Sequence, residues 1–362
     1  MAEIRTAHPY HAYDAIFLQP ALIDQVLAQR EAIDRAAQAV AQKERIVLVG
    51  IGTSLHAARV AESWLRDFSG GRIWAHVEQS FELIHHLIVL GAGDAVIVIT
   101  HTGTTTASVE ALRVARAAGA LTVAITGKMS GDGVRGADFR IETCDQELAF
   151  AYTKSYTTAL AVLALMAIRI AEKKTGVTGT ERLAELSRVP AMMQEALKLE
   201  PRVREWAERI APLARIEIFG SGATWATASE AALKIKEACY IAAEGFETEE
   251  ILHGPFSETD SRGSLVGLFV GDATDERGRQ ILRAAGDLKM QRAAITVPTA
   301  NRDLAAEAIF VVPQCPAWLS AFVHLVPLQL LMYQLALERR TSPDSGRMEQ
   351  SEHAAASKHY KY

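Results

Sequence analysis

Short apolar runs alternate with alanine-rich amphipathic stretches along most of the chain. The runs 45–50 ("RIVLVG") and 121–126 ("LTVAIT") are mainly apolar and have the length of buried strands. The stretch 107–119 ("ASVEALRVARAAG") instead places its apolar residues at helical spacing. Strands that alternate with helices in this way predict a parallel sheet with helices on both faces.

This pattern occurs twice. Residues 45–62 ("RIVLVGIGTSLHAARVAE") and 215–232 ("RIEIFGSGATWATASEAA") both read as an apolar strand, a Gly-x-Gly turn, a hydroxyl residue and an alanine-rich helix. Both are followed by a strand that enters a turn of small residues. We therefore predict two copies of one α/β domain, joined in the polar stretch 172–183. The predicted parts are an N-terminal helical extension (1–29), a first domain (30–175), a second domain (180–340) and a C-terminal tail (341–362).

The composition is typical of a soluble globular protein. The chain has 362 residues, enough for two domains, and a net charge of -5, which gives no indication of a nucleic-acid partner. Three scattered cysteines without a CxxC motif indicate a reducing compartment. The start of the chain lacks a signal-peptide pattern, and the apolar stretch 159–168 has about half the length of a membrane span. We expect a cytoplasmic protein without a membrane partner.

The two copies differ in the turn after their second core strand. The first copy has "THTGTTT" (100–106) there, and the second has "GDATDE" (271–276). Hydroxyls and free N–H groups at a helix N-terminus suit a phosphate, whereas the acidic residues of the second copy would repel one. The alternative is that the threonines only cap the helix, but a cap needs one hydroxyl and this turn has five threonines. The pattern favours a phosphate site in the first copy.

The Gly-x-Gly turn of the first copy lacks the pattern of a dinucleotide site. In "GIGTSL", Leu55 stands where a third glycine is needed, and the nearest acid for a ribose is Glu78. The chain has no GxxxxGK[ST] motif, and His85-His86 comes without ligand-spaced partners. We therefore expect no cofactor and no metal. Thr53 and Ser54 remain as two further hydroxyls that can surround a phosphate or sugar together with the threonine turn.

A polar stripe crosses the stretch 230–240 ("EAALKIKEACY"). On a helix, Glu230, Lys234 and Glu237 lie within about 60° of one another, and Lys236 points in another direction. One of these polar faces can line a site. A salt bridge from Glu237 to Lys234 is the structural alternative. For His253 in "ILHGPF", the spacing alone favours a loop residue beside Gly-Pro.

Several of these motifs, in this order, resemble the sugar isomerase (SIS) domain family, most closely the isomerase half of the glucosamine-6-phosphate synthases. The likeness extends from about residue 15 to 337. It is carried by "GIGTS" (50–54), "THTGTT" (100–105), "YTKSYTT" (152–158), "EAALKIKE" (230–237) and "LHGPF" (252–256). It implies two tandem SIS domains, each a three-layer, flavodoxin-like α/β sandwich. Synthases begin with a glutaminase domain, for which a chain that starts "MAEIR" leaves no room, so we expect an isomerase module that does not use glutamine.

The resemblance also implies roles for single residues. Glu237 matches the carboxylate that moves a proton between C1 and C2. His253 matches the histidine that opens the sugar ring and reaches in from the partner subunit of a homodimer. Lys234 matches a neighbour on the active-site side of the helix. The positions that match sugar-phosphate-binding residues are Thr53, Ser54, Thr100, Thr102 and Thr105.

The chain departs from the family pattern at three places. His101 and Thr104 replace a glutamine and a glutamate of the phosphate turn, and Tyr152 replaces a small serine. We count His101 and Tyr152 among the substrate-binding candidates. An ungapped alignment puts Ser351 at the lysine that synthases carry in their tail. Lys358 can take that place only if the tail is rerouted, and a solvated, mobile tail is the alternative.

Three functions fit these motifs. The first is an isomerase or aminosugar deaminase that acts on a hexose or hexosamine 6-phosphate. The second is a deglycase that splits a fructosamine-type 6-phosphate into a sugar phosphate and an amine. The third is a sugar-phosphate-binding regulator without turnover, although the residues before Arg45 leave little room for a DNA-binding helix-turn-helix.

Overall fold

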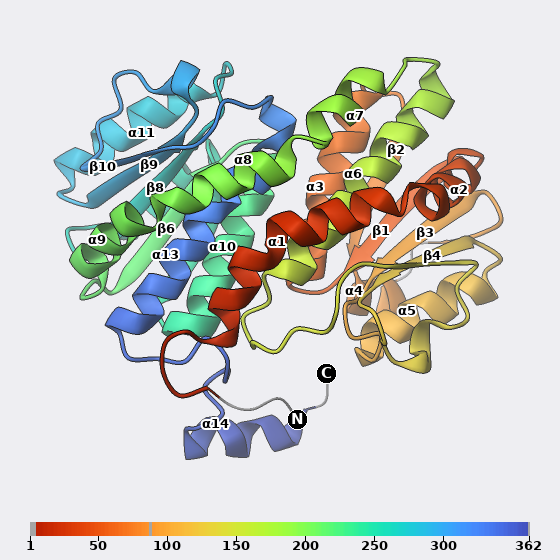
Figure 1. The fold of residues 1–362 in the computed structure, drawn as a ribbon, viewed down its shortest axis with the longest axis horizontal. Helices are drawn as coiled ribbons and strands as arrows, with labels where there is room; N and C mark the ends of the chain where they lie inside the picture. Colours follow the sequence, from red (N-terminus) through yellow and green to blue (C-terminus); the bar gives the residue numbers. More distant parts are fainter. Residues whose placement is uncertain (1–4, 87–88, 361–362) are drawn as a thin grey trace. The chain divides into compact units, whose positions relative to one another are not determined.

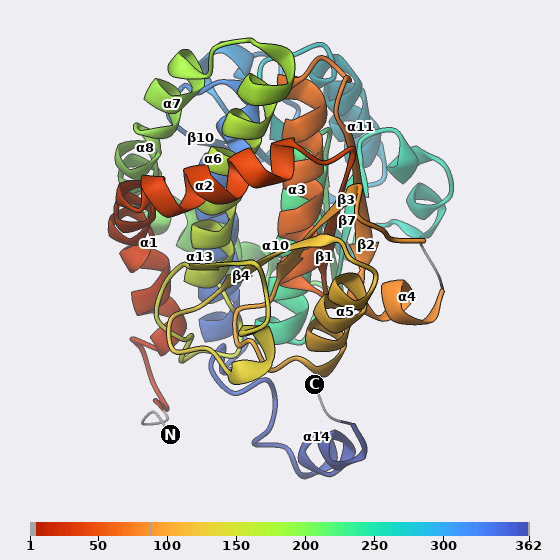
Figure 2. The ribbon, with the colours of Figure 1, turned by 90° about the vertical axis from the view of Figure 1, so that its right-hand side faces the viewer.

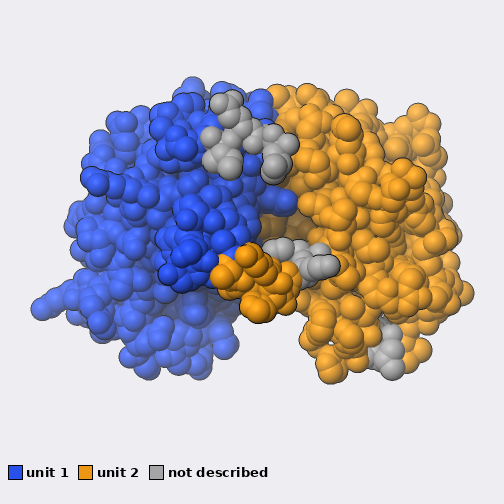
Figure 3. Space-filling model, turned by 90° about the horizontal axis from the view of Figure 1, so that it is seen from below, with its two compact units in different colours: residues 1–20, 148–153, 189–354 blue, residues 21–147, 154–188, 355–362 orange. Residues whose placement is uncertain are grey.

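The computed structural model describes residues 5–86 and 89–360 and divides the chain into two compact units (Figure 3). The β1–β5 unit comprises Ala21–Glu147, Lys154–Arg188 and residues 355–360. The β6–β10 unit comprises residues 5–20, Leu148–Thr153 and Val189–Ala354. Helix α1 (His11–Ala28) is divided between the units: it belongs to the β6–β10 unit up to Pro20 and to the β1–β5 unit from Ala21. The predicted domain boundaries at 29, 175, 180 and 340 remain predictions.

A five-stranded parallel sheet forms the centre of the β1–β5 unit. Its strand order is β2-β1-β3-β4-β5. The strands are β1 (Arg45–Gly50), β2 (Trp74–Gln79), β3 (Asp94–Ile99), β4 (Leu121–Thr126) and β5 (Phe139–Glu142). β1, β3 and β4 are almost entirely buried, as their apolar sequences predict.

Helices cover both faces of this sheet (Figures 1 and 2). From β1, the chain passes through α3 (Thr53–Phe68) to β2; from β3, it passes through α5 (Thr106–Ala117) to β4, on the opposite side of β1. Because such crossovers are right-handed, opposite directions place α3 and α5 on opposite faces. The other helices are α2 (Arg30–Ala41), α4 (Ser80–His85), α6 (Lys154–Thr175) and α7 (Thr180–Leu186).

The β6–β10 unit repeats this architecture strand for strand. Its parallel sheet has the order β10-β9-β8-β6-β7, so β6 and β8 correspond to β1 and β3. The strands are β6 (Arg215–Gly220), β7 (Ala242–Glu247), β8 (Gly263–Phe269), β9 (Gln291–Thr296) and β10 (Ala308–Val311). The predicted internal repeat and the predicted α/β fold class are confirmed.

The helices of the β6–β10 unit are likewise arranged around its sheet (Figure 1). α10 (Ala223–Cys239) packs on β6 and β7, α13 (Leu325–Glu338) packs on α10, and α11 (Asp275–Asp287) packs on β8 and β9. The others are α8 (Val189–Ala196), α9 (Glu200–Ile210), α12 (Ser320–Val323) and, in the tail, α14 (Ser351–Ala356). Short 3-10 turns at Glu250–Leu252 and Pro255–Glu258 follow β7.

Two helical segments of the described chain are long and apolar enough to cross a membrane. They are Lys154–Thr175 and Ala317–Glu338, and 89% and 100% of their most apolar windows are buried within the fold. Burial of this kind is typical of the core helices of a folded domain.

Candidate functional site

The turn after β1 brings the helix α3 close to its strand. A Cβ on Gly50 would lie 2.6 Å from the Ser54 carbonyl carbon, so a side chain there would push the helix away. Gly52, the residue before the helix, has a left-handed φ of 55°. A glycine at this position has no side chain to cap the helix. The first turn of α3 begins with the half-buried hydroxyl residues Thr53 and Ser54.

The threonine turn after β3 is a cluster of hydroxyls. The Thr104 hydroxyl donates to Thr102 Oγ1 over 3.0 Å, and the oxygens of Thr102 and Thr105 are 3.5 Å apart. Thr105 is the residue before α5, yet its side chain makes no capping hydrogen bond. Thr100 is buried, and its hydroxyl has no partner among the described residues. Thr105 thus does not cap α5 with its side chain, whereas Thr102 Oγ1 also accepts a hydrogen bond of 3.3 Å from the Thr104 N–H within the turn.

The two turns lie at the carboxyl-terminal ends of two neighbouring strands. β1 and β3 are adjacent parallel strands, with Val49 opposite Val98. Adjacent strands are about 4.8 Å apart, so the residues that follow Gly50 and Ile99 are neighbours. The chain leaves β1 and β3 in opposite directions, and the crevice at such a point is where parallel sheets bind ligands. The structure thus brings Thr53 and Ser54 to the same carboxyl-terminal end of the sheet as Thr100, Thr102 and Thr105.

His101 makes contacts within its own unit. Its Nε2 accepts a hydrogen bond of 3.1 Å from the Glu147 N–H, and its carbonyl accepts one of 2.9 Å from the Gly127 N–H. A Cβ on Gly127 would lie 2.5 Å from the His101 ring. Burial, assisted by Lys154, lowers the pKa of His101 to about 4, so the ring is neutral at pH 7. His101 therefore fixes the loop before Glu147, and its role as a substrate-binding residue remains a prediction.

In the second copy, the corresponding turn already holds a carboxylate. Asp275 accepts hydrogen bonds from the Val270 N–H (3.1 Å) and the Gly271 N–H (2.9 Å). The side chain is buried, and burial raises the pKa of Asp275. Counting from the ends of β3 and β8, Asp275 takes the position of Thr105. The second turn is occupied by its own acid, which agrees with a phosphate site in the first copy only.

The polar stripe on α10 forms a buried ion-pair cluster. The Lys234 ammonium lies 2.5 Å from Glu237 Oε2 and 3.8 Å from Glu230 Oε1. Lys234 and Glu230 are fully buried, whereas the Glu237 side chain is 22% exposed. Lys236 is exposed, as its different helical direction predicts. The salt bridge considered as the structural alternative is therefore present, and Glu237 is the member of the cluster that reaches solvent.

Glu237 also lines a surface cavity of about 350 Å³ within the β6–β10 unit. Arg347 and His353 of the C-terminal tail line the same cavity. No sequence motif connects these two residues to α10, so only the folded tail places them beside Glu237. Ser351, which aligns with the synthase lysine, begins α14, and Lys358 is an exposed residue of the β1–β5 unit.

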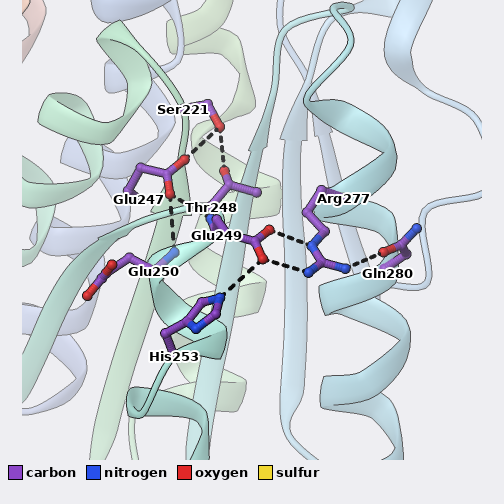
Figure 4. Close-up of polar contacts among 8 residues, drawn as sticks. All are labelled: Ser221, Glu247, Thr248, Glu249, Glu250, His253, Arg277 and Gln280. Atoms are coloured by element: carbon purple, nitrogen blue, oxygen red, sulfur yellow. Dashed lines mark hydrogen bonds and ion pairs between the residues drawn. The ribbon is translucent and has the colours of Figure 1, made fainter.

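His253 belongs to a polar network after β7 (Figure 4). Its Nε2 lies 3.3 Å from Glu249 Oε1, and Glu249 accepts two hydrogen bonds of 2.7 Å from the Arg277 guanidinium. Arg277, and then His253, lower the pKa of Glu249 to about 2, so this carboxylate stays charged. His253 itself is 67% exposed. The network orients an accessible imidazole by a charged partner, which is how proton-transferring histidines are held.

The remaining side chains of Figure 4 close the neighbouring turn. The Ser221 hydroxyl donates to Thr248 Oγ1 over 2.7 Å, and Glu247 accepts hydrogen bonds from the Glu249 and Glu250 N–H groups.

The predicted substrate residue Tyr152 is half-buried in the segment Leu148–Thr153. In the described part of the chain, no three His, Cys, Asp or Glu side chains are grouped to hold a metal ion.

Comparison with known proteins identifies a domain in the first half of the chain. Residues 39–169 match the SIS domain family. The chain is 32% identical over 358 residues to glutamine–fructose-6-phosphate aminotransferase [isomerizing] of Thermococcus kodakarensis, which covers 96% of this chain and 58% of that protein. The chain thus spans about half the length of the curated relatives it matches.

Solved structures show the same fold. The C-terminal domain of glucosamine-fructose-6-phosphate aminotransferase from Francisella tularensis superposes with a TM-score of 0.88 at 23% identity, over 94% of this chain and 99% of that domain. Glucosamine-6-phosphate deaminase from Thermotoga maritima gives a TM-score of 0.69 at 22% identity, over 90% and 96%. Residues 39–169 therefore form a SIS domain, and the second sheet repeats its fold.

Proposed function

We propose that this protein is a phosphosugar isomerase-type enzyme that acts on a hexose or hexosamine 6-phosphate. The observation that carries the proposal is Glu237. It is a partly exposed carboxylate that is paired with a buried lysine and opens to a cavity. The relatives named as isomerising aminotransferases and the structural neighbour named as a deaminase both act on sugar phosphates, as their names state.

The proposed reaction is a proton shift between C1 and C2. Glu237 acts as the base that takes the proton next to a carbonyl or imine and returns it to the neighbouring carbon. Lys234 is a positioning residue, because its ammonium holds the Glu237 carboxylate at 2.5 Å. Within the β1–β5 unit, we propose that the uncharged donors of the β1 and β3 turns bind a phosphate, since backbone N–H groups and hydroxyls at helix N-termini bind anions.

We propose that His253 opens the sugar ring. Its exposure and the fixed Glu249–Arg277 pair suit a histidine that donates and accepts protons. In line with the family resemblance, we propose a homodimer in which His253 serves the site of the partner subunit. Because an isologous dimer has two identical sites, mixing two inactive variants tests this arrangement. Statistical dimers of Glu237→Gln and His253→Ala should recover about one quarter of the wild-type activity, and no recovery would reject the shared site.

A substrate panel followed by NMR tests the proposed function. Fructose 6-phosphate with ammonia, glucosamine 6-phosphate, and a fructosamine 6-phosphate are incubated separately with the protein. Turnover of at least one is expected, and Glu237→Gln should lower kcat about 10³-fold while sugar-phosphate binding persists. Unchanged turnover in Glu237→Gln would reject the base assignment. Binding without turnover in the wild type would instead favour a regulator.

A further inference from the structure

The cavity beside Glu237 has an unusual mixture of charged and apolar walls. Lys236 and Arg347 contribute two cations, His353 contributes an exposed imidazole, and Phe150, Tyr240 and Ile241 contribute ring and aliphatic surface. Among the described lining residues, the only acid is Glu237, which shares Lys234 with the buried Glu230. The lining itself therefore carries two cations and one acid, and Glu349, which accepts a hydrogen bond from the Tyr240 hydroxyl, lies near Arg347.

Arg347 is held as a preformed binding group. Its guanidinium lies 4.7 Å from the centre of the Tyr240 ring, and its Nε donates to Gln350 Oε1 over 2.9 Å. Within the described residues, its two terminal nitrogens have no hydrogen-bond or ion-pair partner. Arg347 and Tyr240 both have left-handed backbones, with φ of 68° and 56°. Non-glycine residues adopt such conformations where the surrounding fold fixes them, and this occurs often at ligand sites.

The tail that carries Arg347 is anchored at several points within the same unit. Asp344 accepts hydrogen bonds from the N–H groups of His11 (2.8 Å) and Ala12 (3.0 Å). The Pro343 carbonyl accepts one of 3.0 Å from the Ala151 N–H. A Cβ on Gly346 would lie 2.4 Å from the Phe150 ring, so tail and ring are in direct contact. The position of Arg347 beside α10 is thus part of the folded unit.

We propose that this cavity binds the amine portion of a fructosamine-type 6-phosphate and that Arg347 recognises a carboxylate on that amine. The inference rests on the proposed function, because it places the reacting carbon of the sugar at Glu237. The planar fork of an arginine matches a carboxylate in a bidentate arrangement. Lys236 adds long-range attraction, and the walls formed by Phe150 and Ile241 fit an aliphatic chain. The substrate class is therefore the ketosamine 6-phosphate of an amino acid.

The chemistry balances with water as the second reactant. Glu237 removes a proton from C1 of the ketosamine, and the C2 carbonyl oxygen takes up a proton from water. The resulting enaminol receives the Glu237 proton at C2, and its N–H proton passes to the hydroxide left by that water. The product is an imine between C1 and the amine. Water adds to C1, the C1–N bond breaks, and an aldose 6-phosphate and the free amino acid leave. The step needs no oxidant and no cofactor.

Two matched substrates and three variants test the subsite. One fructosamine 6-phosphate is made from 4-aminobutyrate and the other from butylamine, so that they differ only in the carboxylate. Wild-type enzyme should prefer the carboxylated substrate by 10- to 100-fold in kcat/KM, mainly through KM. Arg347→Met should abolish this preference, and Arg347→Lys should retain only part of it, because lysine lacks the fork. The control Arg204→Met, which removes an exposed arginine of α9 outside the cavity, should leave the preference unchanged.

The result separates this subsite from the proposed function. Turnover of sugar phosphates without a carboxylate preference, or with a preference that survives in Arg347→Met, would overturn the subsite and leave the enzyme assignment standing. Absence of turnover with every sugar phosphate would overturn the enzyme assignment. Calorimetric binding of the same two ligands would then decide the subsite: a carboxylate preference lost in Arg347→Met supports it, and equal affinities overturn it.

Discussion

Replacement of Lys234 by methionine should destabilise the protein strongly, because it leaves a buried acid without its cation. Lys234 and Glu230 are both fully buried, and the Lys234 ammonium lies 3.8 Å from Glu230 and 2.5 Å from Glu237. Methionine keeps most of the volume of the lysine stem, so the loss of charge dominates over the loss of packing.

The size of the effect follows from the 3.8 Å separation and from burial. Two unit charges at that distance attract by about 4 kcal/mol at an effective dielectric constant near 20. Removing one partner of a buried pair typically costs about 3–5 kcal/mol, since the other charge stays buried and uncompensated. We therefore expect Lys234→Met to lower the free energy of unfolding by about 3–5 kcal/mol at pH 8.

Urea unfolding at pH 8, followed by circular dichroism, measures this loss. The second variant is Glu230→Gln/Lys234→Met, which removes the stranded acid together with the lysine. We expect the double variant to regain most of the stability, because a neutral amide is much less costly to bury than a carboxylate. A Lys234→Met protein as stable as the wild type, or a double variant no better than the single one, would refute this account of the α10 stripe.

Three further predictions address the phosphate turn, a buried acid and the histidine network. Thr102→Val/Thr105→Val should weaken binding of a 6-phosphorylated sugar about 100-fold in calorimetry while a sugar without phosphate binds as before; equal weakening would indicate fold damage. Burial raises the pKa of Glu217 to about 7, above its unfolded value of 4.5; the charged groups nearby are Arg215, Glu244, Glu258 and Asp260. The protonated carboxyl of Glu217 therefore contributes its full stability below pH 4.5, and this contribution is lost as pH rises through 7. Glu217→Gln should thus raise the free energy of unfolding by about 1–3 kcal/mol at pH 8 and leave it nearly unchanged at pH 4.5, and the opposite pH order would contradict the assignment. Glu249→Gln should lower kcat about tenfold with little change in KM, whereas the control Gln280→Ala, which contacts only Arg277 in this network, should keep wild-type rates; an unaffected Glu249→Gln enzyme would exclude the orienting role.

The central strands could be predicted from the sequence and the edge strands could not. β1, β3 and β4 are almost entirely buried and therefore appear as mainly apolar runs. β2 ("WAHVEQ") and β7 ("AAEGFE") are edge strands of their sheets and are only partly buried. Their sequences show neither an apolar run nor a clear alternation of apolar and polar residues. Their places follow from pairing with β1 and β6, which is a tertiary property.

The parts of the site that depend on local sequence could be predicted, and the contacts between distant segments could not. Helical geometry alone placed Glu230, Lys234 and Glu237 on one face, and the structure confirms that they form one cluster. The repeat comparison identified the turn that lacks acids. In contrast, the contacts of His101 with Glu147 and of Arg347 with Tyr240 join segments that are 46 and 107 residues apart. Tyr240 ends α10 in a left-handed conformation without the glycine that usually marks such an end.

The central claim is that Glu237 carries a proton between C1 and C2 of a sugar phosphate. Incubation of fructose 6-phosphate or glucosamine 6-phosphate with the enzyme in deuterium oxide, followed by proton NMR, observes that step directly. The account predicts loss of the C1 or C2 proton signal with wild-type enzyme and no exchange above the uncatalysed rate with Glu237→Gln. Exchange that continues in Glu237→Gln at the wild-type rate, with the sugar phosphate still bound, would contradict it.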